Sequence, residues 1–176
     1  LPAAAFMEYP PGQAEPAYLE LKDIVRKKGM DVITAKRGQT YRVGKEVLLH
    51  ILYPEDRVAE SLAQGNENNY SLVILLEYRD TSVLFTGDIE GGVETYLTGR
   101  MGREEVDILK VPHHGSNTSS TAPFLDAVSP ETGVIQVGTN LFGHPTSQTL
   151  DRLEQTGAEV YRNDNQGAVM MRYRDN

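Results

Sequence analysis

The sequence contains no cysteine and no tryptophan, and these absences narrow the chemistry open to the chain. Without cysteine there is no disulfide framework, no thiolate-bound zinc or iron-sulfur cluster and no thiol nucleophile. No segment approaches the roughly 18 consecutive apolar residues that a membrane-spanning helix needs. Any chemistry must therefore use His, Asp, Glu, Ser or Lys side chains, or backbone groups.

Basic residues are also scarce, with 17 Lys and Arg against 25 Asp and Glu and a formal net charge of -8. Nucleic-acid binding through a basic face depends on Lys and Arg that neutralise phosphates, so this charge argues against such a protein. It does not exclude a nuclease whose positive charge comes from bound metal ions. The 176 residues, 39% of them apolar, suffice for one domain whose core closes without disulfides.

The order of apolar and polar segments predicts a layered α/β fold. Repeated prolines make residues 1–17 a linker or loop, and residues 18–176 carry the fold. Helical spacing of apolar residues predicts helices over 18–28, 90–101, 122–128 and 147–155. Apolar or β-branched runs predict strands over 31–35, 40–43, 47–53, 70–78, 82–86, 107–111, 133–137, 159–161 and 168–173. The first three of these strands are expected to form a small meander, and the polar stretch 54–69 a loop.

Polar clusters follow three of the predicted strands. They are Thr86-Gly87-Asp88, His113-His114-Gly115-Ser116 and Gly143-His144-Pro145. Ligands of layered α/β proteins bind beyond the carboxyl ends of strands, so the three clusters could converge on one site. Imidazole and carboxylate groups suit zinc, manganese and iron, and glycine lets the backbone approach a metal closely. A metal site with nitrogen and oxygen ligands is the most economical use of these residues.

Each of these residues also has a plain structural interpretation. An Asp between a strand and a helix is more often an N-cap, and Asp88 taken alone would be one. His144 alone would be an ordinary loop residue, and His50, inside an apolar strand, is expected to have no chemical role. Ser116 lacks the turn of a serine nucleophile, and no phosphate loop or dinucleotide fingerprint occurs. The paired carboxylates of a glycosidase stay open, although nothing in the sequence selects them.

An ordered set of motifs carries a family resemblance. The motifs are Asn68-Asn69-Tyr70-Ser71-Leu72-Val73, Leu84-Phe85-Thr86-Gly87-Asp88, residues 106–116 with their His-His-Gly-Ser ending, Phe142-Gly143-His144-Pro145 and residues 161–167. Together they resemble the metallo-β-lactamase-fold domain of ComEC-type DNA internalisation proteins. The resemblance implies a layered αββα sandwich with a site between its sheets that holds two divalent metal ions, Mn²⁺ or Zn²⁺.

The resemblance also implies roles for individual residues. Asp88 would bridge both metals, and His144 would be a terminal metal ligand. His113 and His114 would lie beside the metals, where they bind the substrate phosphate or complete the metal shell. We expect Asp88, His144 and one of the paired histidines to lie within about one metal shell, since coordination distances are close to 2 Å. Contact with phosphate, or a role in holding the loop, is implied for Ser116 and Asn69.

One motif of the family is absent. Its main metal-binding turn, H-x-x-x-D-H or H-x-D-x-D-H, matches none of the four histidines, His50, His113, His114 and His144. Because this turn lies near the start of the fold, we expect residues 18–176 to be the C-terminal part of the domain. Alone, they should bind divalent metal weakly and have little or no phosphodiesterase activity.

The leading hypothesis is a metal-dependent phosphodiesterase, a nuclease domain that degrades DNA during natural transformation. The resemblance implies single-stranded DNA as the substrate. It also implies an extracytoplasmic location, with the domain tethered to the membrane domains of an integral cell-membrane protein.

Two alternatives stay open. One is a related phosphoester hydrolase, such as a choline phosphodiesterase acting on teichoic acid, which an aromatic cage for quaternary ammonium would favour. The other is a domain that has lost its metals and serves as a scaffold. Basic residues near the site, Arg100, Arg103 and Lys110, are expected to form a solvated face rather than a DNA track.

Overall fold

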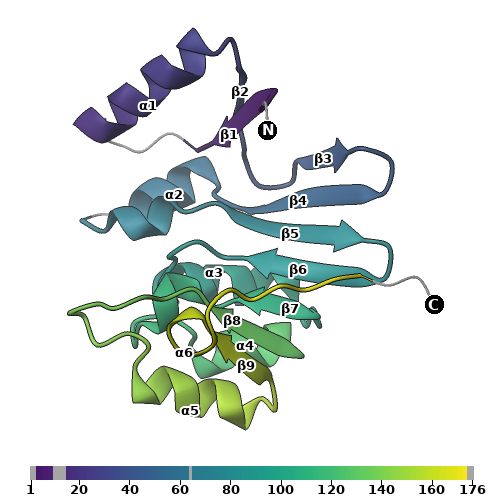
Figure 1. The fold of residues 1–176 in the computed structure, drawn as a ribbon, viewed down its shortest axis with the longest axis vertical. Helices are drawn as coiled ribbons and strands as arrows, with labels where there is room; N and C mark the ends of the chain where they lie inside the picture. The colour runs from purple at the N-terminus through teal and green to yellow at the C-terminus, as the bar shows by residue number, and fades with distance from the viewer. Residues whose placement is uncertain (1–2, 10–14, 64, 174–176) are drawn as a thin grey trace.

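The computed structural model describes residues 3–9, 15–63 and 65–173. A seven-stranded sheet of order β3-β4-β5-β6-β7-β8-β9 dominates the fold, and β1 and β2 form a second, two-stranded sheet (Figure 1). The strands are β1 (Ala5–Glu8), β2 (Asp31–Thr34), β3 (Thr40–Val43), β4 (Val47–Tyr53), β5 (Val73–Tyr78), β6 (Thr81–Phe85), β7 (Ile108–Lys110), β8 (Thr132–Ile135) and β9 (Glu159–Arg162). The helices are α1 (Pro16–Lys27), α2 (Asp56–Leu62), α3 (Gly91–Met101), α4 (Ala122–Val128), α5 (Ser147–Gln155) and α6 (Asn163–Gln166), with short 3-10 turns η1 (Glu67–Tyr70) and η2 (Pro112–Gly115).

The strand pairing of the large sheet changes from antiparallel to parallel at β6. Strands β3 to β6 are antiparallel neighbours joined in sequence, whereas β6, β7, β8 and β9 run parallel. Parallel neighbours need crossover connections, and α3, α4 and α5 lie in these connections. The carboxyl ends of β6, β7 and β8 therefore meet at one edge of the sheet.

One face of the sheet packs on helices and forms the core. Leu84, Leu109 and Ile135, from adjacent parallel strands, are fully buried in one cluster with residues of the crossover helices, Val93, Leu97, Phe124, Leu125 and Leu153. Two helices are joined through a carboxylate, because Glu94 of α3 accepts hydrogen bonds from the backbone N–H groups of Ser120 and Thr121 before α4. This arrangement holds the parallel half of the sheet rigidly beneath the site.

The opposite face of the sheet is also apolar. Leu76 lies between Leu49 and Val83 across the strands, and Ile74 lies between Ile51 and Phe85. Successive residues of a strand point to opposite faces, so these rows face away from the helices. Phe85 is 41% exposed there. The segment after α6 reaches this face, because the rings of Tyr78 and Tyr173 lie 5.0 Å apart in an edge-to-face contact.

Several predicted elements need correction near the N-terminus. Within the predicted linker 1–17, Ala5–Glu8 forms β1, and α1 already begins at Pro16, a position where the missing N–H costs nothing. Strand β2 pairs in parallel with β1 rather than joining a meander with β3 and β4. The pairing of β1 with β2, which lie far apart in the sequence, explains why these two segments differ from the prediction. The prolines at 10 and 11 lie outside the described residues.

Two further segments differ from their predictions. The predicted loop 54–69 contains α2 and η1, because Val58, Ala59 and Leu62 pack against the core despite the polar residues around them. The predicted strand 168–173 forms no β-ladder, and Met170 is 75% exposed. None of the helices in the described ranges combines the length and apolar character needed to cross a membrane.

The buried Glu94 yields a stability prediction. Replacing Glu94 by Ala leaves two buried N–H groups without an acceptor, so we expect the free energy of unfolding to fall by about 2–4 kcal/mol. Urea denaturation followed by circular dichroism measures this. Glu105→Ala, at an exposed position, is the control and should change stability by less than about 0.5 kcal/mol. Equal effects of the two substitutions would contradict the role of Glu94.

The same residue yields a pH prediction. Burial raises the pKa of Glu94 above its ordinary 4.5, although the hydrogen bonds from Thr121 and Ser120 work in the opposite direction. Folding therefore favours the protonated carboxyl, and this contribution is lost as pH rises through the raised pKa. We expect wild type to lose stability relative to Glu94→Gln as the pH rises above 4.5. A constant difference across that range would show that Glu94 titrates normally.

Candidate functional site

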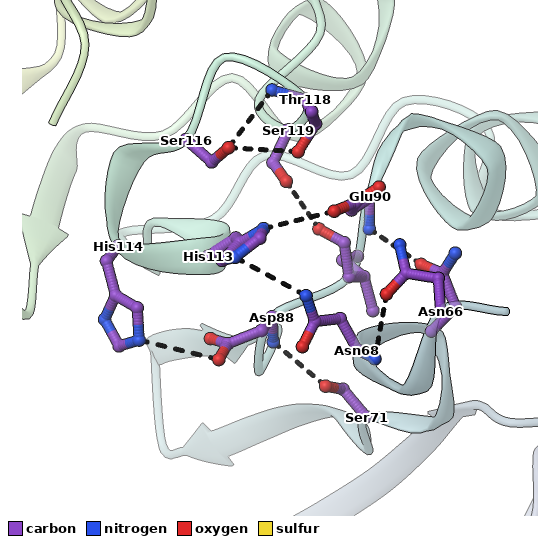
Figure 2. Close-up of polar contacts among 12 residues, drawn as sticks. Asn66, Asn68, Ser71, Asp88, Glu90, His113, His114, Ser116, Thr118 and Ser119 are labelled. Atoms are coloured by element: carbon purple, nitrogen blue, oxygen red, sulfur yellow. Dashed lines mark hydrogen bonds and ion pairs between the residues drawn. The ribbon is translucent and has the colours of Figure 1, made fainter. Parts of the chain in front are cut away.

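The first component of the site is the tight turn after β6. Gly87 has φ +56°, and a Cβ atom there would lie 2.5 Å from Ser71 Cβ and 2.7 Å from Ser71 Oγ. The Asp88 N–H donates to the same Ser71 hydroxyl at 3.0 Å (Figure 2). The N-cap of α3 is Glu90, so Asp88 does not fill the structural role that its position suggested. Its carboxylate is instead presented at the strand edge.

The second component is the histidine turn after β7. His113, His114 and Gly115 have φ values of +47°, +54° and +82° in succession. Non-glycine residues rarely adopt this left-handed conformation, and strain of this kind clusters at functional sites. At Gly115 a Cβ atom would lie 2.5 Å from Pro145 Cβ. The backbone is thus held in an unusual shape by close packing against Pro145, which lies in the third loop of the site, between β8 and α5.

Backbone hydrogen bonds join the three loops directly. The His113 N–H donates to the Gly87 carbonyl at 3.3 Å, and the Thr146 N–H donates to the Gly115 carbonyl at 3.0 Å. The structure therefore brings together the three polar clusters that the sequence places after separate strands.

Asp88 and His114 approach each other at the spacing expected of two ligands on one metal ion. His114 Nδ1 lies 2.6 Å from the Gln136 carbonyl oxygen, which only accepts, so Nδ1 carries the proton and a neutral ring keeps its lone pair on Nε2. That Nε2 lies 3.5 Å from Asp88 Oδ2 (Figure 2). Two ligands on a tetrahedral ion with bonds near 2.1 Å are about 3.4 Å apart. The pair therefore fits adjacent positions on one ion.

His113 lies behind this pair. Its Nδ1 is buried without a hydrogen-bond partner and lies 3.3 Å from Glu90 Oε1, while its Nε2 lies 3.4 Å from the Asn68 amide nitrogen (Figure 2). Its ring centroid is 5.4 Å from that of His144. His113 thus connects the third loop to η1 and to the start of α3.

His144 is positioned by a residue that sequence reasoning missed. The Asn140 side chain accepts from the N–H groups of Phe142 and His144 and donates to the carbonyls of Gly138 and His144. Burial lowers the pKa of His144, the neighbouring His113 and His114 lower it further, and Asp88 opposes them. The neutral imidazole favoured in this way is the form that binds metals.

Lys110 was also missed, and its predicted place on a solvated face is wrong. Its side chain is 16% exposed, donates to the Gly87 carbonyl at 2.9 Å and lies 3.7 Å from Asp88 Oδ1. Burial lowers the pKa of Lys110, and the Asp88 charge opposes this shift. The signal available in the sequence was its position within a short apolar strand that ends at the site.

The two residues proposed for phosphate contact or loop holding are nearly buried. Ser116 is 3% exposed, and its Oγ accepts from the Thr118 N–H at 3.3 Å (Figure 2). Asn69 is 6% exposed, donates to the Leu62 carbonyl and accepts from the Glu90 N–H. These contacts fit the loop-holding alternative.

His50 stands apart on β4, where its ring contacts Thr40 and Glu77.

The candidate ligands do not form a complete metal shell. Within the described part of the chain, no group of three or more His, Asp and Glu side chains could hold a metal ion. The expectation of a single shared shell is therefore not met by these residues alone, and only Asp88 and His114 reach ligand spacing. The metal roles of Asp88 and His144 stay predictions.

Comparison with known proteins gives a family match and several relatives. The model of the Metallo-beta-lactamase superfamily matches residues 49–139. ComE operon protein 3 of Bacillus subtilis is 30% identical over 163 residues, which cover 92% of this chain and 20% of that protein. Recombination protein 2 of Haemophilus influenzae is 32% identical, with coverages of 82% and 19%. Competence protein ComA of Neisseria gonorrhoeae is 37% identical, with coverages of 59% and 15%.

The chain thus spans about a fifth or less of the length of these relatives. Two solved structures share its fold at 14% identity. The diiron β-hydroxylase CmlA from Streptomyces venezuelae has a TM-score of 0.56 over 91% of this chain and 38% of that chain. A protein from Parabacteroides distasonis, assigned as a metal-dependent hydrolase, has a TM-score of 0.51 over 92% and 77%. The predicted fold class and the resemblance to ComEC-type proteins are confirmed.

The tight packing at Gly87 predicts that alanine substitutions at Gly87 and at Gly99 change stability in opposite directions. We expect Gly87→Ala to lower the free energy of unfolding by about 2–4 kcal/mol, because it adds left-handed strain and a clash with Ser71. Gly99, in α3, has open space around its Cβ position, so Gly99→Ala should raise stability by roughly 0.5–1 kcal/mol. Thermal denaturation of both variants checks this. A harmless Gly87→Ala would mean that the turn can relax.

Proposed function

This chain belongs to the metallo-beta-lactamase superfamily, and we propose that it supplies part of the active site of a metal-dependent phosphodiesterase, the nuclease domain of a DNA-uptake protein. Membership of the superfamily implies metal-dependent hydrolase chemistry in general. The names of the competence relatives support the finer assignment to DNA.

The Asp88–His114 pair carries this proposal. A carboxylate and an imidazole lone pair face each other at 3.5 Å, a spacing that suits ligands of one ion, and their side chains are 34% and 46% exposed. The hydrogen bond from His114 Nδ1 to the Gln136 carbonyl fixes the tautomer, as is usual for metal-binding histidines. The pair is thus oriented before any ion arrives and is open to a substrate.

Asp88, His114 and His144 would hold the ions, and His113 would lie beside them. Two divalent ions, Mn²⁺ or Zn²⁺, would supply Lewis-acid stabilisation of a phosphoryl group and activation of water. Lys110 holds the Gly87 carbonyl and keeps the Asp88 turn in place. His113, with Glu90 at 3.3 Å from its Nδ1 and the Asn68 amide at 3.4 Å from its Nε2, would hold these loops in place beside the ions.

We also propose that residues 18–176 are the C-terminal part of a larger metallo-β-lactamase-like domain, whose remainder provides the missing ligands. The apolar rows on the second face of the large sheet support this, because sheet faces of that kind pack against another layer. The isolated β1–β2 pair supports it as well, since parallel sheets are usually covered on both faces, and Val32 in β2 is 47% exposed.

The proposals for substrate and location rest on the resemblance to competence proteins rather than on the geometry. We propose single-stranded DNA as the substrate, and an extracytoplasmic position in which membrane domains of a longer polypeptide tether this part. The negative charge of the chain fits a site that attracts cations, which in turn attract phosphate.

Metal titration tests the site. Calorimetry with MnCl₂ should show weak binding to the isolated chain, lost in Asp88→Asn. Asp126→Asn, the same change at an exposed position of α4, should bind like wild type. In a longer polypeptide that includes the remainder of the domain, Asp88→Asn should reduce manganese-dependent DNA hydrolysis by at least about 100-fold.

Three outcomes would contradict the proposal. Strong nuclease activity of the isolated chain would show that no further ligands are needed. Cleavage of p-nitrophenyl phosphorylcholine without cleavage of DNA would favour the teichoic-acid alternative. Full metal binding by Asp88→Asn would place the ions elsewhere.

A further inference from the structure

An exposed aromatic side chain stands beside the candidate metal site. Leu141 and Phe142 lie in the loop between β8 and α5, and their side chains are 103% and 82% exposed. The Phe142 ring stacks against His144, with ring centroids 5.9 Å apart and an angle of 30° between the planes. One face of the Phe142 ring is therefore covered by a site residue while most of the side chain is open to solvent.

Hydrogen bonds within the loop hold the backbone that carries this ring. All four hydrogen bonds available to the Asn140 side-chain amide are made inside the loop, two of them to the N–H groups of Phe142 and His144 at 3.0 and 3.1 Å. A well-ordered aromatic ring costs little further entropy when a flat ligand stacks on it.

Phe142 borders a pocket of about 470 Å³. This volume lies within the range of about 300–1,000 Å³ that is typical of small-molecule sites. The other lining residues are uncharged amides, a hydroxyl and apolar groups, together with the two histidines: His114, Gln136, Val137, Gly138, Thr139, Asn140, His144 and Asn163. In the described part of the chain, the Gln136 amide and the Thr139 hydroxyl make no side-chain hydrogen bond, so both are available to a ligand.

The pocket continues into the candidate metal site. His114 lines the pocket and also places its Nε2 3.5 Å from Asp88 Oδ2, while its Nδ1 bonds to the Gln136 carbonyl. A ligand that fills the pocket therefore extends to within reach of the Asp88–His114 pair.

We propose that this pocket binds one nucleobase of a nucleic-acid strand, next to the phosphate held at the metal site. The base stacks on Phe142, and its polar edge meets Gln136 and Thr139. This assignment rests on the proposed phosphodiesterase function and deepens it, because it makes the unstacked bases of a single strand the recognised feature. Stacking on an aromatic side chain accepts every base, since each has a π-face.

The chemistry of the pocket favours a base over other ligands. Among the described residues no Lys or Arg lines it, so it does not suit a phosphate. A membrane surface would use the Leu141–Phe142 tip but would not need the polar groups behind it. Quaternary ammonium prefers a cage of several aromatic rings, whereas the lining residues that the structure describes include one aromatic ring besides the histidines, that of Phe142.

Nuclear magnetic resonance titration of the isolated chain tests this proposal without turnover or metal. Deoxyadenosine 5′-monophosphate should shift the amide resonances of residues 136–144, whereas 2-deoxyribose 5-phosphate should not. Phe142→Ala should weaken nucleotide binding by roughly 5- to 150-fold. Phe142→Tyr, which keeps the ring, should bind like wild type. Leu141→Ala is the matched control, because it removes a neighbouring exposed apolar side chain and should change affinity less than about two-fold.

Other results would overturn the assignment. Equal shifts from 2-deoxyribose 5-phosphate would mean a phosphate site only, and Phe142-dependent shifts from phosphocholine would mean a quaternary-ammonium site. Equal weakening by Phe142→Ala and Leu141→Ala, with binding to phosphatidylcholine vesicles, would make the tip a membrane contact. Nucleotide binding with no DNA hydrolysis by the complete domain would refute the nuclease alone. Hydrolysis without Phe142-dependent nucleotide binding would refute the base site alone.

Discussion

The candidate site depends on one constraint, the meeting of three parallel strand ends at a single edge of the sheet. Strands β6, β7 and β8 run in the same direction, so the loops that follow them leave the sheet side by side. Two backbone hydrogen bonds and the close contact of Gly115 with Pro145 then join the loops. The contact of Gly87 with Ser71 ties the first of these loops to the chain before β5.

Charged and polar groups surround the Asp88 carboxylate. A largely buried Lys110 lies on one side of the carboxylate at 3.7 Å, and His114 Nε2 lies on the other at 3.5 Å. Burial and the neighbouring rings lower the pKa of His144, which favours its neutral form. The site thus combines one fixed negative charge with imidazole groups in their ligand form, which suits a cation and, through it, a phosphate.

The sequence predicted the elements whose pattern is local. Helices α3, α4 and α5 and most strands of the large sheet follow from apolar periodicity and from capping or breaking residues. Elements fixed by distant contacts were missed: β1 exists through its pairing with β2, and α2 through the packing of Ala59 and Leu62 on the core. The segment 168–173 has the apolar pattern of a strand but finds no strand to pair with in the described structure.

The same distinction holds at the site. Asp88, His113, His114 and His144 could be selected because each follows a strand next to glycine or proline. The contributions of Lys110 and Asn140 depend on which carbonyl or N–H group comes within reach after folding, and no sequence pattern encodes that directly. Likewise, the spacing of Asp88 and His114 is set by φ values that only the packed loops enforce.

Paramagnetic broadening by Mn²⁺ tests the central claim, that these three strand ends form a metal-binding edge, most directly. Substoichiometric Mn²⁺ added to the ¹⁵N-labelled chain should broaden the amide resonances of residues 87–88, 113–115 and 144 first. Mg²⁺ added in excess over the Mn²⁺ should only partly reverse this broadening. Broadening that instead begins at acidic surface residues such as Glu60 or Glu154, with the strand-end resonances unaffected, would contradict the account.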